Sequence, residues 1–397
     1  MFNWQITIGF LKLNALLCLV VFACGTIGAT NEVRFHAWGG SAQVNQYIQW
    51  VSQQVNQQHG ITINHVKLAD TSDAVSRVLA EKSAGNHHNG SVDLIWINGE
   101  NFAAMQSNGL LAPSWVNELA NFSLTNPTEN PAVLTDFGLP TNGQEAPWGR
   151  AAMVFYYNSA HVKTPPKTAH ELMSFVVENP GSFAYPTPND YLGISFLKYL
   201  LIALNRGNTD GLYRPAMPEM FAELTTPLWA FLDTLHPHMW RQGTHMLRQA
   251  SHMQRLIDDE VLHLGFSFTA AEIPSAVNRF DLPPTIRTYA MADGSLSNIH
   301  FVAIAYNSPN ADNAKKVVNF LLSPVAQAYK KRLDVWGDDT VLDVALLPNE
   351  DAQLFQVEGA HPSALPPSER IIMFAEPHAS WTDALRNAWF ERYGARY

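Results

Sequence analysis

Beyond residue 30, the apolar positions predict strands and helices in regular alternation. The runs at 33–37, 61–68 and 92–97 have the length and composition of strands. The helix expected between the first two places these apolar residues on one face: Val44, Tyr47, Ile48, Val51 and Val55. A second helix, before the third strand, is indicated by Val75, Val78 and Leu79. Because 92–97 is almost continuously apolar, it suits a central strand, and the order predicts a doubly wound α/β sheet with right-handed crossovers.

The same pattern returns later in the chain. Three strands are predicted at 153–157, 261–268 and 301–306. A helix is predicted at 191–205, and Ser323 followed by Pro324 has the pattern of an N-cap and a first helical residue. Near the end, helical spacing recurs at Trp381, Leu385 and Trp389. The chain is therefore expected to be an α/β protein throughout.

The N-terminal segment has the parts of a secretory signal peptide. One basic residue, Lys12, precedes the apolar stretch 13–23, and small residues follow up to Ala29. Cleavage after Ala29 is expected, which would export the protein. The stretch is short for a membrane span, and no later stretch reaches about 18 uninterrupted apolar residues. The alternative is a lipid anchor on Cys24, because 21–24 loosely matches a lipoprotein signal.

Composition and charge narrow the classes of function. The chain has 397 residues, of which 47% are apolar and 15% charged, so it can bury a large core. At roughly 150 residues per domain, the part after the signal peptide suggests two domains. Without Lys12, the chain has 24 basic and 35 acidic residues, a net charge of −11. Because nucleic acids are negatively charged, such a chain is not expected to bind them. Because Cys18 and Cys24 both lie in the signal peptide, the mature chain should have no disulfide, thiol nucleophile or thiolate metal ligand.

Several short motifs occur in a characteristic order. They begin with a strand, loop and helix at 35–50 and a strand that ends in Asn98-Gly99. They continue as Gly109-Leu110-Leu111 before Pro113, Pro147-Trp148-Gly149, the segments 164–172 and 180–188, and Leu322-Ser323-Pro324. This order resembles the extracellular solute-binding proteins of bacterial ABC importers, in the type II branch with polyamine, thiamine, sulfate and ferric-ion binders. The combination of 96–101 with 335–338 is similar to an uncharacterised subgroup sometimes linked to thiamine.

The resemblance implies two doubly wound α/β lobes joined by two hinge strands, a periplasmic binding protein-like fold of type II. The hinge crossings would lie near 147–158 and 298–307. Lobe 1 would comprise 30–147 and 305–397, the latter with a C-terminal helical segment, and lobe 2 would comprise 148–304. A monomer in the periplasm would close its cleft around one small solute and deliver it to the transmembrane subunits of an ABC permease, without a cofactor.

Candidate ligand contacts follow from the position of binding sites in α/β sheets, beyond the carboxyl ends of the strands. In lobe 1 these positions hold Trp38, Gly39, Gly40, Asn98, Glu100 and Asn101. Lobe 2 and the hinges would add Trp148, Asp190, Tyr191, Ser267 and Asn298.

Each chemical role has a structural alternative. Trp38 and Trp148 would stack on a flat or cationic solute, or else pack a loop. The glycine pair 39–40 would let backbone N–H groups approach a ligand, or form a tight turn. Glu100 and Asp190 would neutralise a cation, or serve as helix-terminus partners and caps.

Other residues leave further alternatives open. Arg150 would bind a carboxylate or phosphate, or pair with an internal acid, and we favour the internal pair. Trp96 lies in an apolar strand and is assigned to the core. Tyr156 and Tyr157 point to opposite faces of a strand, which disfavours a shared ferric ion. The histidines, including those at 87–88 and at 236, 238, 245 and 252, are interpreted as surface groups rather than a zinc or nickel site.

No catalytic residues are expected. The chain has no G-x-S-x-G, H-E-x-x-H, P-loop or G-x-G-x-x-G motif in a strand-to-helix context. The acids at 258–260 would point in different directions on a helix. The hypothesis is therefore a solute-binding protein for a small organic cation such as thiamine or a polyamine. The alternatives are an anion or metal complex bound with Arg150, a solute sensor of the same fold and, last, an exported hydrolase.

Overall fold

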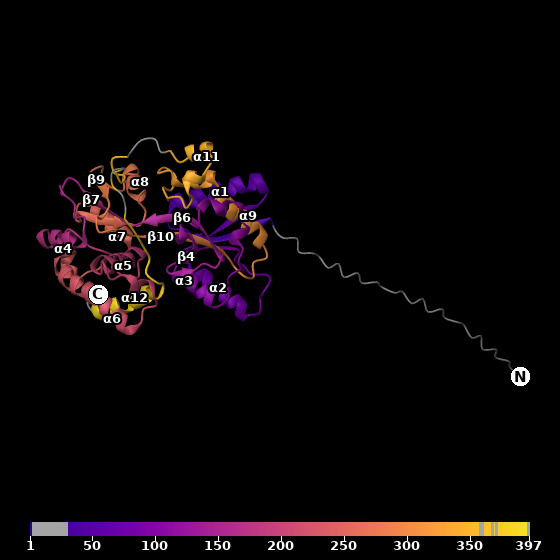
Figure 1. Ribbon diagram of the computed structural model, residues 1–397, viewed down its shortest axis with the longest axis horizontal. Coiled ribbons are helices and arrows are strands. Elements are labelled where there is room, and N and C mark those ends of the chain that lie inside the picture. Colours follow the sequence, from indigo (N-terminus) through magenta and orange to yellow (C-terminus); the bar gives the residue numbers. More distant parts are fainter. Residues whose placement is uncertain (2–30, 357–360, 367–368, 370–371, 395–397) are drawn as a thin grey trace. The chain divides into compact units, whose positions relative to one another are not determined.

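The computed structural model describes residue 1 and residues 31–356, 361–366, 369 and 372–394 (Figure 1). The predicted signal peptide, its cleavage site and both cysteines, with the lipid-anchor alternative at Cys24, lie outside this part of the chain. Two separate hydrophobic cores organise the described residues from 31 onward. We call the structure around the first core lobe 1 and that around the second core lobe 2.

Lobe 1 is built on a core that unites residues 33–148 with residues 299–347. Its helices and strands are β1 (Glu32–Trp38), α1 (Ala42–His59), β2 (Thr62–Leu68), α2 (Ser72–Ser83), β3 (Leu94–Ile97), α3 (Glu100–Ser107), β4 (Thr135–Asp136), β5 (Leu139–Pro140), β6 (Glu145–Ala152), α9 (Ala311–Leu321), α10 (Pro324–Lys331) and α11 (Asn349–Gln353). All five predicted apolar positions of α1 are buried, and its ends are a Ser41 N-cap and Gly60 in the left-handed conformation. In α2, Leu79 is exposed and Ala74 is buried instead.

A mixed sheet runs through lobe 1 in the order β11-β10-β3-β1-β2, where β11 is Met373–Ala375 and β10 is Ser295–Ile304. β6 pairs with β10 as well. β1 is parallel to both β2 and β3, with Phe35 opposite His65 and Leu94. β10 (Ser295–Ile304) is antiparallel to β3 and β6. Since β1 and β3 are parallel, their carboxyl ends lie at one edge, as the predicted doubly wound arrangement requires.

Lobe 2 has its own core, formed by residues 153–296 and 381–393. Its helices and strands are β7 (Val154–Asn158), α4 (Ala169–Glu178), α5 (Tyr191–Leu204), α6 (Pro218–Leu235), α7 (Ala250–Asp258), β8 (Leu264–Ser267), α8 (Glu272–Asn278), β9 (Ile286–Tyr289) and α12 (Ser380–Tyr393). Its sheet has the order β8-β7-β9, and both neighbours are antiparallel to β7. α5 is buried throughout 193–202, as expected for a helix that is apolar on all sides.

Three segments connect the lobes. β6 and β10 leave the core of lobe 1 and continue into lobe 2, and they pair with each other along most of their length. The third connection contains β11 (Met373–Ala375), which pairs in parallel with the start of β10. This third connection was not predicted from the sequence, because a three-residue strand has no detectable period.

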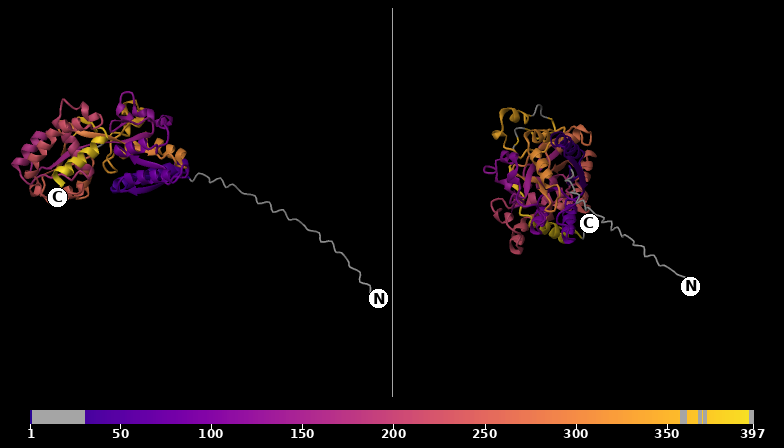
Figure 2. Two further views of the ribbon diagram at one scale, coloured as in Figure 1. Left: turned by 90° about the horizontal axis from the view of Figure 1, so that it is seen from below. Right: turned by 90° about the vertical axis from the view of Figure 1, so that its right-hand side faces the viewer.

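The third connection corrects the expected assignment of 305–397 to lobe 1. It leads to α12, whose Trp381, Leu385 and Trp389 are fully buried in the core of lobe 2. Figures 1 and 2 show this helix, in yellow, among the helices of lobe 2. The helical spacing of these residues predicted a buried face, but spacing carries no information about which core receives it.

Short 3₁₀ helices complete the connections: Val116–Glu118, Ala120–Thr125, Pro131–Leu134, Asp210–Tyr213, His236–His238, Trp240–Gly243 and Val344–Leu346. Among the described helices, none combines the length and apolar character needed to cross a membrane.

Candidate functional site

Charged side chains from both lobes meet where the lobes face each other. Glu100, at the start of α3 in lobe 1, lies 3.9 Å from Arg386 on α12 of lobe 2. The ammonium of Lys198, on α5, lies 4.5 Å from the ring centre of Phe137, which follows β4. We call this region the interlobe site, and its members are Glu100, Asp136, Phe137, Tyr191, Lys198, Asn298, Glu376 and Arg386.

A buried ion pair anchors the interlobe site. Lys198 Nζ lies 2.9 Å from Glu376 Oε2, and each side chain is only 2% exposed. Burial raises the pKa of Glu376, and the opposing effects of Lys198 and the Asn298 amide only partly offset it. The other oxygen, Oε1 of Glu376, has no hydrogen-bond partner among the described residues. Glu376 therefore neutralises Lys198 with one oxygen and leaves the second for a donor.

Asp136 is a second buried acid at the interlobe site. Its Oδ2 accepts a hydrogen bond of 2.6 Å from the backbone N–H of Gly99, a residue in the left-handed region at φ 60°. A side chain at position 99 would collide with the ring of Phe137, which explains the glycine. Burial raises the pKa of Asp136 well above its ordinary value, and Glu100 and Glu376 add repulsion. Its Oδ1 also lacks a partner within the described residues.

A cavity of about 320 Å³ lies beside these acids. Its wall includes Phe137, Arg150, Asn298, Ile299, Ala375 and Glu376. These residues come from the turn after β4 and from all three interlobe connections. The volume is at the lower end of the range for small-molecule sites, so the cavity fits a solute of modest size.

Tyr191 connects the wall of this cavity to lobe 2. The amide of Asn298 donates a hydrogen bond of 2.5 Å to its hydroxyl, and the ring packs edge-on against Phe268. Burial of the hydroxyl raises the pKa of Tyr191, although the residue as a whole is 46% exposed. Oδ1 of Asn298 has no partner in the described part of the chain. Two residues predicted from sequence, Tyr191 and Asn298, therefore come together at one place.

The predicted residues after β1 lie in an irregular segment beside one exposed ring. Trp38 is 45% exposed at the end of the strand. A Cβ atom at Gly40 would lie 2.5 Å from its indole, and one at Gly39 would lie 2.6 Å from Cβ of Lys67. The two glycines are therefore needed because neighbouring side chains pack closely over the backbone.

The predicted residues after β3 surround the bond between Asp136 and Gly99. Asn98 precedes this glycine and Glu100 and Asn101 follow it, and all three are partly buried. Glu100 raises the pKa values of Asp136 and Glu376, so its carboxylate acts on both buried acids. This loop thus belongs to the interlobe site.

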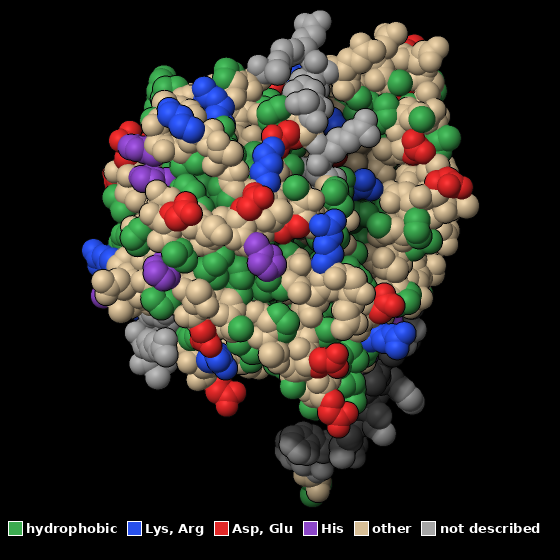
Figure 3. Space-filling view, turned by 60° about the vertical axis from the view of Figure 1, so that its left-hand side comes forward, with side chains coloured by type: hydrophobic (Ala, Val, Ile, Leu, Met, Phe, Trp, Pro, Cys, Tyr) green, Lys and Arg blue, Asp and Glu red, His purple; other side chains and the backbone are tan. Residues whose placement is uncertain are grey.

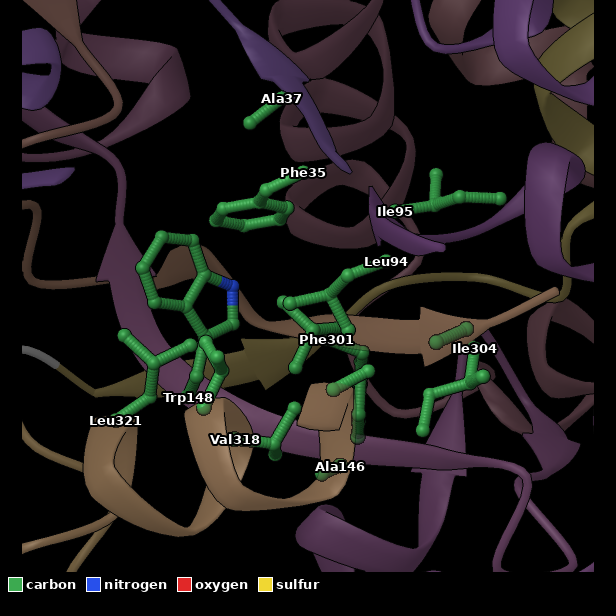
Figure 4. Packing of buried hydrophobic residues seen from close by; sticks show 14 of the residues in the cluster. Phe35, Ala37, Leu94, Ile95, Ala146, Trp148, Phe301, Ile304, Val318 and Leu321 are labelled. Carbon is green, nitrogen blue, oxygen red and sulfur yellow. The ribbon is translucent and has the colours of Figure 1, made fainter. Parts of the chain in front are cut away.

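Trp148 was predicted to contact the ligand, and this prediction was wrong. It is completely buried and packs against Phe35 and Trp96, with the edge-on Trp96 ring centre 5.0 Å away. Figure 4 shows it beside Phe35 and Leu321 in the core of lobe 1. Trp148 belongs to this core together with Ala146, so its indole lies inside lobe 1 and not at the interlobe site. Trp148 therefore packs inside the protein and does not stack on a solute.

Asp190 and Ser267 are also corrected, because local bonds occupy their side chains. Asp190 caps α5 through Leu192 N at 2.8 Å and binds the start of α7 through Ala250 N at 3.0 Å. The hydroxyl of Ser267 bonds to Glu272 and to the backbone of Thr269. Both side chains therefore organise lobe 2 from within.

Within the described residues, Arg150 does not form the internal ion pair that was expected from the sequence. The arginines that form ion pairs in the described part of the chain are Arg34, Arg279, Arg332, Arg386 and Arg392. Arg150 is not among them and instead lines the cavity. Trp96, by contrast, packs against the core of lobe 1, as expected.

The described residues contain no group of three His, Cys, Asp or Glu side chains that could hold a metal ion. Two of the histidines make contacts with tyrosines. His87 lies 3.0 Å from the Tyr306 hydroxyl, and His236 lies 2.7 Å from that of Tyr185. His236 is 3% exposed, so its interpretation as a surface group was wrong.

Asp136, Lys198 and Glu376 were not among the site residues predicted from the sequence. A signal existed only for Lys198, which is a single charge within the otherwise apolar stretch 191–204. Asp136 lies in the two-residue strand β4 and Glu376 follows the three-residue strand β11, too short for a detectable pattern, and only the fold brings them to Lys198.

The two-lobed fold and the solute-sized cavity at the lobe boundary define a solute-binding protein. The chain belongs to the bacterial extracellular solute-binding proteins, which it matches over residues 50–350. It is similar to Protein YnjB of Escherichia coli (strain K12), with 39% identity over 362 residues that cover 91% of each chain. Membership of this family confirms the type of protein and the extracytoplasmic setting that the resemblance implied.

Solved structures share the fold at low sequence identity. The spermidine/putrescine ABC transporter substrate-binding protein PotD of Streptococcus pneumoniae is 16% identical, with a TM-score of 0.62 over 92% of this chain and 99% of that one. An extracellular solute-binding protein of Bordetella parapertussis is 12% identical, with a TM-score of 0.65 over 93% and 99%. Ferric ion-binding protein A of Pasteurella haemolytica is 14% identical, with a TM-score of 0.60 over 92% and 98%. These likenesses confirm the type II fold.

Proposed function

We propose that this protein binds a small organic cation, such as thiamine or a polyamine, at the interlobe site and delivers it to an ABC permease. The observation that carries the proposal is a set of three buried acceptor atoms without partners among the described residues: Asp136 Oδ1, Asn298 Oδ1 and Glu376 Oε1. They come from three separate segments of the chain. A buried acceptor without a donor is costly, so a solute with N–H donors or a positive charge would relieve that cost.

Aromatic groups at the same boundary support a cationic solute. Phe137 already holds the Lys198 ammonium 4.5 Å from its ring centre. Trp38 and Tyr191 each have about half of their surface exposed and lie at strand and helix ends, where ligands bind in such folds. Aromatic faces attract organic cations, more strongly when water is excluded. The Streptococcus pneumoniae relative is described as a spermidine/putrescine binder, which agrees with this substrate class.

The proposed action is capture by lobe closure, with no bond made or broken. The contacts between Glu100 and Arg386 and between Lys198 and Phe137 join the two lobes across the site. A solute that binds groups of both lobes favours the closed arrangement by its difference in affinity for the two states. We further propose that the mature protein begins after Ala29, acts as a periplasmic monomer and presents its closed form to the permease.

Thermal unfolding of the chain from residue 30 tests this function. The panel contains thiamine, putrescine and spermidine, with sulfate, ferric citrate, a sugar and neutral amino acids for comparison. A bound compound at 100 times its Kd adds about 2.7 kcal/mol of stability, which raises the midpoint by several degrees. We expect shifts with cations only. A shift confined to sulfate or ferric citrate would instead support the alternative of an anion or metal complex.

Glu376→Gln then tests the site. Calorimetry should show a Kd for the cation at least tenfold weaker, since the variant keeps the shape but leaves Lys198 uncompensated. Glu118→Gln is the matched control, because Glu118 is an exposed lobe 1 acid paired with Lys315, and its Kd should equal that of the wild type. Equal affinity in the Glu376 variant would contradict this location for the solute.

A further inference from the structure

We propose that the start of α8 is a latch that holds lobe 2 against lobe 1 and thereby raises the affinity of the interlobe site for its solute. The consequence for affinity rests on the proposed function, whereas the latch is a property of the two lobes themselves. We call this contact the α8 latch. It consists of Ala271 and Ser275 of lobe 2 with Gln43, Leu333 and Gly337 of lobe 1.

One hydroxyl group of lobe 2 binds two separate segments of lobe 1. Ser275 Oγ accepts a hydrogen bond of 3.0 Å from the side-chain amide of Gln43, on α1. The same hydroxyl donates a hydrogen bond of 3.0 Å to the backbone carbonyl of Leu333, which follows α10. Ser275 is only 5% exposed, so both bonds are shielded from water. They form only while the lobes are in contact, and they favour that arrangement.

The two lobes also approach each other closely one helical turn before Ser275. Gly337 of lobe 1 packs against Ala271, and a Cβ atom at position 337 would collide with the Cβ atom of Ala271. Ala271 is 1% exposed. Gly337 also has a φ of 75°, which favours glycine. Both the backbone conformation and the neighbouring lobe therefore require a glycine at this position.

The two sides of the α8 latch are attached to different cores. On α8, Ile273 and Ala276 belong to the core of lobe 2. In lobe 1, the core residues Val335 and Trp336 lie between the two latch residues of that segment. A rotation of one lobe against the other must therefore open the latch. A small contact of this kind, with few apolar side chains, allows such motion, whereas a large hydrophobic interface would resist it.

The α8 latch is separate from the charged contacts of the interlobe site. In Figure 1, α1 and α8 lie above the connecting strands β6 and β10, and α3 and α12 lie below them. None of the five latch residues belongs to the wall of the cavity. A solute that needs both lobes binds in proportion to the fraction of molecules whose lobes are together. The latch increases this fraction and so raises the affinity from outside the cavity.

Spin labels on the two sides measure the latch directly. The chain from residue 30 contains no cysteine, so Gln49→Cys on α1 and Asp281→Cys after α8 provide the only labelling sites, both at exposed positions. In Gly337→Ala, the added methyl group collides with Ala271. We expect the distance between the labels to lengthen by at least about 1 Å, since non-bonded carbon atoms stay about 3.5–4.0 Å apart. Adding Ala271→Gly removes the collision and should restore the wild-type distance.

Gly85→Ala separates the contact between the lobes from the strain of the backbone. Gly85 has a φ of 76°, close to that of Gly337, but a Cβ atom there would meet no described atom within 4 Å. The label distance should therefore equal that of the wild type. Ser275→Ala is a second probe of the latch, because it removes both hydrogen bonds without adding bulk. It should broaden the distribution of distances.

Calorimetry with spermidine and with thiamine connects the latch to the solute. For the cation that binds the wild type, we expect the Kd to rise at least tenfold in Gly337→Ala and to return to within about threefold when Ala271→Gly is added. A lengthened distance with an unchanged Kd would overturn the role of the latch in affinity.

The label distances separate failure of the latch from failure of the proposed function. Wild-type distances in both Gly337→Ala and Ser275→Ala, or no restoration by Ala271→Gly, would overturn the latch and leave the cation site standing. If neither cation binds the wild type, the proposed function is contradicted. The label distances, which need no solute, then decide whether the latch holds the lobes together.

Discussion

At the scale of single residues, two phenylalanines share a strained left-handed backbone conformation but differ in what surrounds their rings. Phe137 has a φ of 42°, and its ring lies against Gly99 and under the Lys198 ammonium. Phe280 has a φ of 62° at the end of α8, yet it is 90% exposed. Left-handed backbone costs a non-glycine residue roughly 1–2 kcal/mol. The strain at Phe137 supports the interlobe site, whereas no packing within the described structure repays the strain at Phe280.

Phe280→Gly should therefore stabilise the protein. Phe280 sits after α8 with the Asp281 N–H donating to the Ala276 carbonyl at 2.9 Å, a helix ending in which glycine is preferred. We expect the free energy of unfolding to rise by about 0.5–1 kcal/mol, measured by urea denaturation. Phe280→Ala, which keeps the strain, is the control and should give no gain. A loss of stability in the glycine variant would mean that the exposed ring makes a stabilising contact.

At the scale of elements, Asp190 joins two helices that the sequence treats as separate. One carboxylate oxygen caps α5 and the other binds the first residue of α7, 60 positions later. Such a double cap fixes the angle between the helix starts as well as satisfying two N–H groups. This use of both oxygens is why the predicted ligand role does not describe this residue.

Asp190→Ala should lower stability without changing the affinity for the solute. Loss of both bonds is expected to cost about 1–2 kcal/mol of unfolding free energy, seen in urea denaturation. Thr168→Ala is the control, because Thr168 caps α4 through a single bond to Glu171 N at 3.1 Å and should cost less. A Kd that weakens tenfold while stability stays unchanged would restore Asp190 as a ligand contact.

The difference between what the sequence predicts and what it misses lies in the range of the interactions. The buried face of α1 and the Ser323 cap of α10 were predicted because they depend on neighbours within a few residues. The partner of Lys198 was not, because Glu376 is 178 positions away in an irregular segment. Of the predicted contacts, Glu100, Tyr191 and Asn298 reach the interlobe site, since strand ends and helix starts do converge there. Trp148 does not, because the face of its strand depends on the register.

At the scale of the whole molecule, the connections between the lobes are also the walls of the cavity. β6, β10 and β11 each contribute to it, so any change in their arrangement alters the shape and charge around a solute. The outer surface carries no comparable concentration of one charge on the face shown in Figure 3, where acidic, basic and histidine side chains are interspersed. Several acids are buried instead, among them Asp136, Glu145 and Glu376, and their effects appear in stability and its dependence on pH.

Glu145 should make the stability of the protein fall as the pH rises. It is 1% exposed on β6, and neither of its carboxylate oxygens has a partner among the described residues. Burial raises the pKa of Glu145 well above its ordinary value, and Asp136 adds repulsion. Below a pH of about 4.3, the folded and unfolded states are both protonated at this group. Above that pH the unfolded chain releases the proton first, so stability declines until the folded protein releases it too.

Glu145→Gln removes this titrating carboxyl group and should make the free energy of unfolding depend less on pH. We expect the two proteins to be similar in stability near pH 4.5, and the variant to be more stable by roughly 1–3 kcal/mol at pH 8, the cost of an unpaired buried polar group. Urea denaturation between these pH values measures the difference, with exposed Glu118→Gln following the wild type. Asp136, whose pKa is raised in the same way, remains in both proteins, so the variant profile should keep a smaller downward slope. Parallel profiles for wild type and Glu145→Gln would mean that Glu145 is charged and satisfied in the folded protein, for example by a bound cation at the lobe boundary.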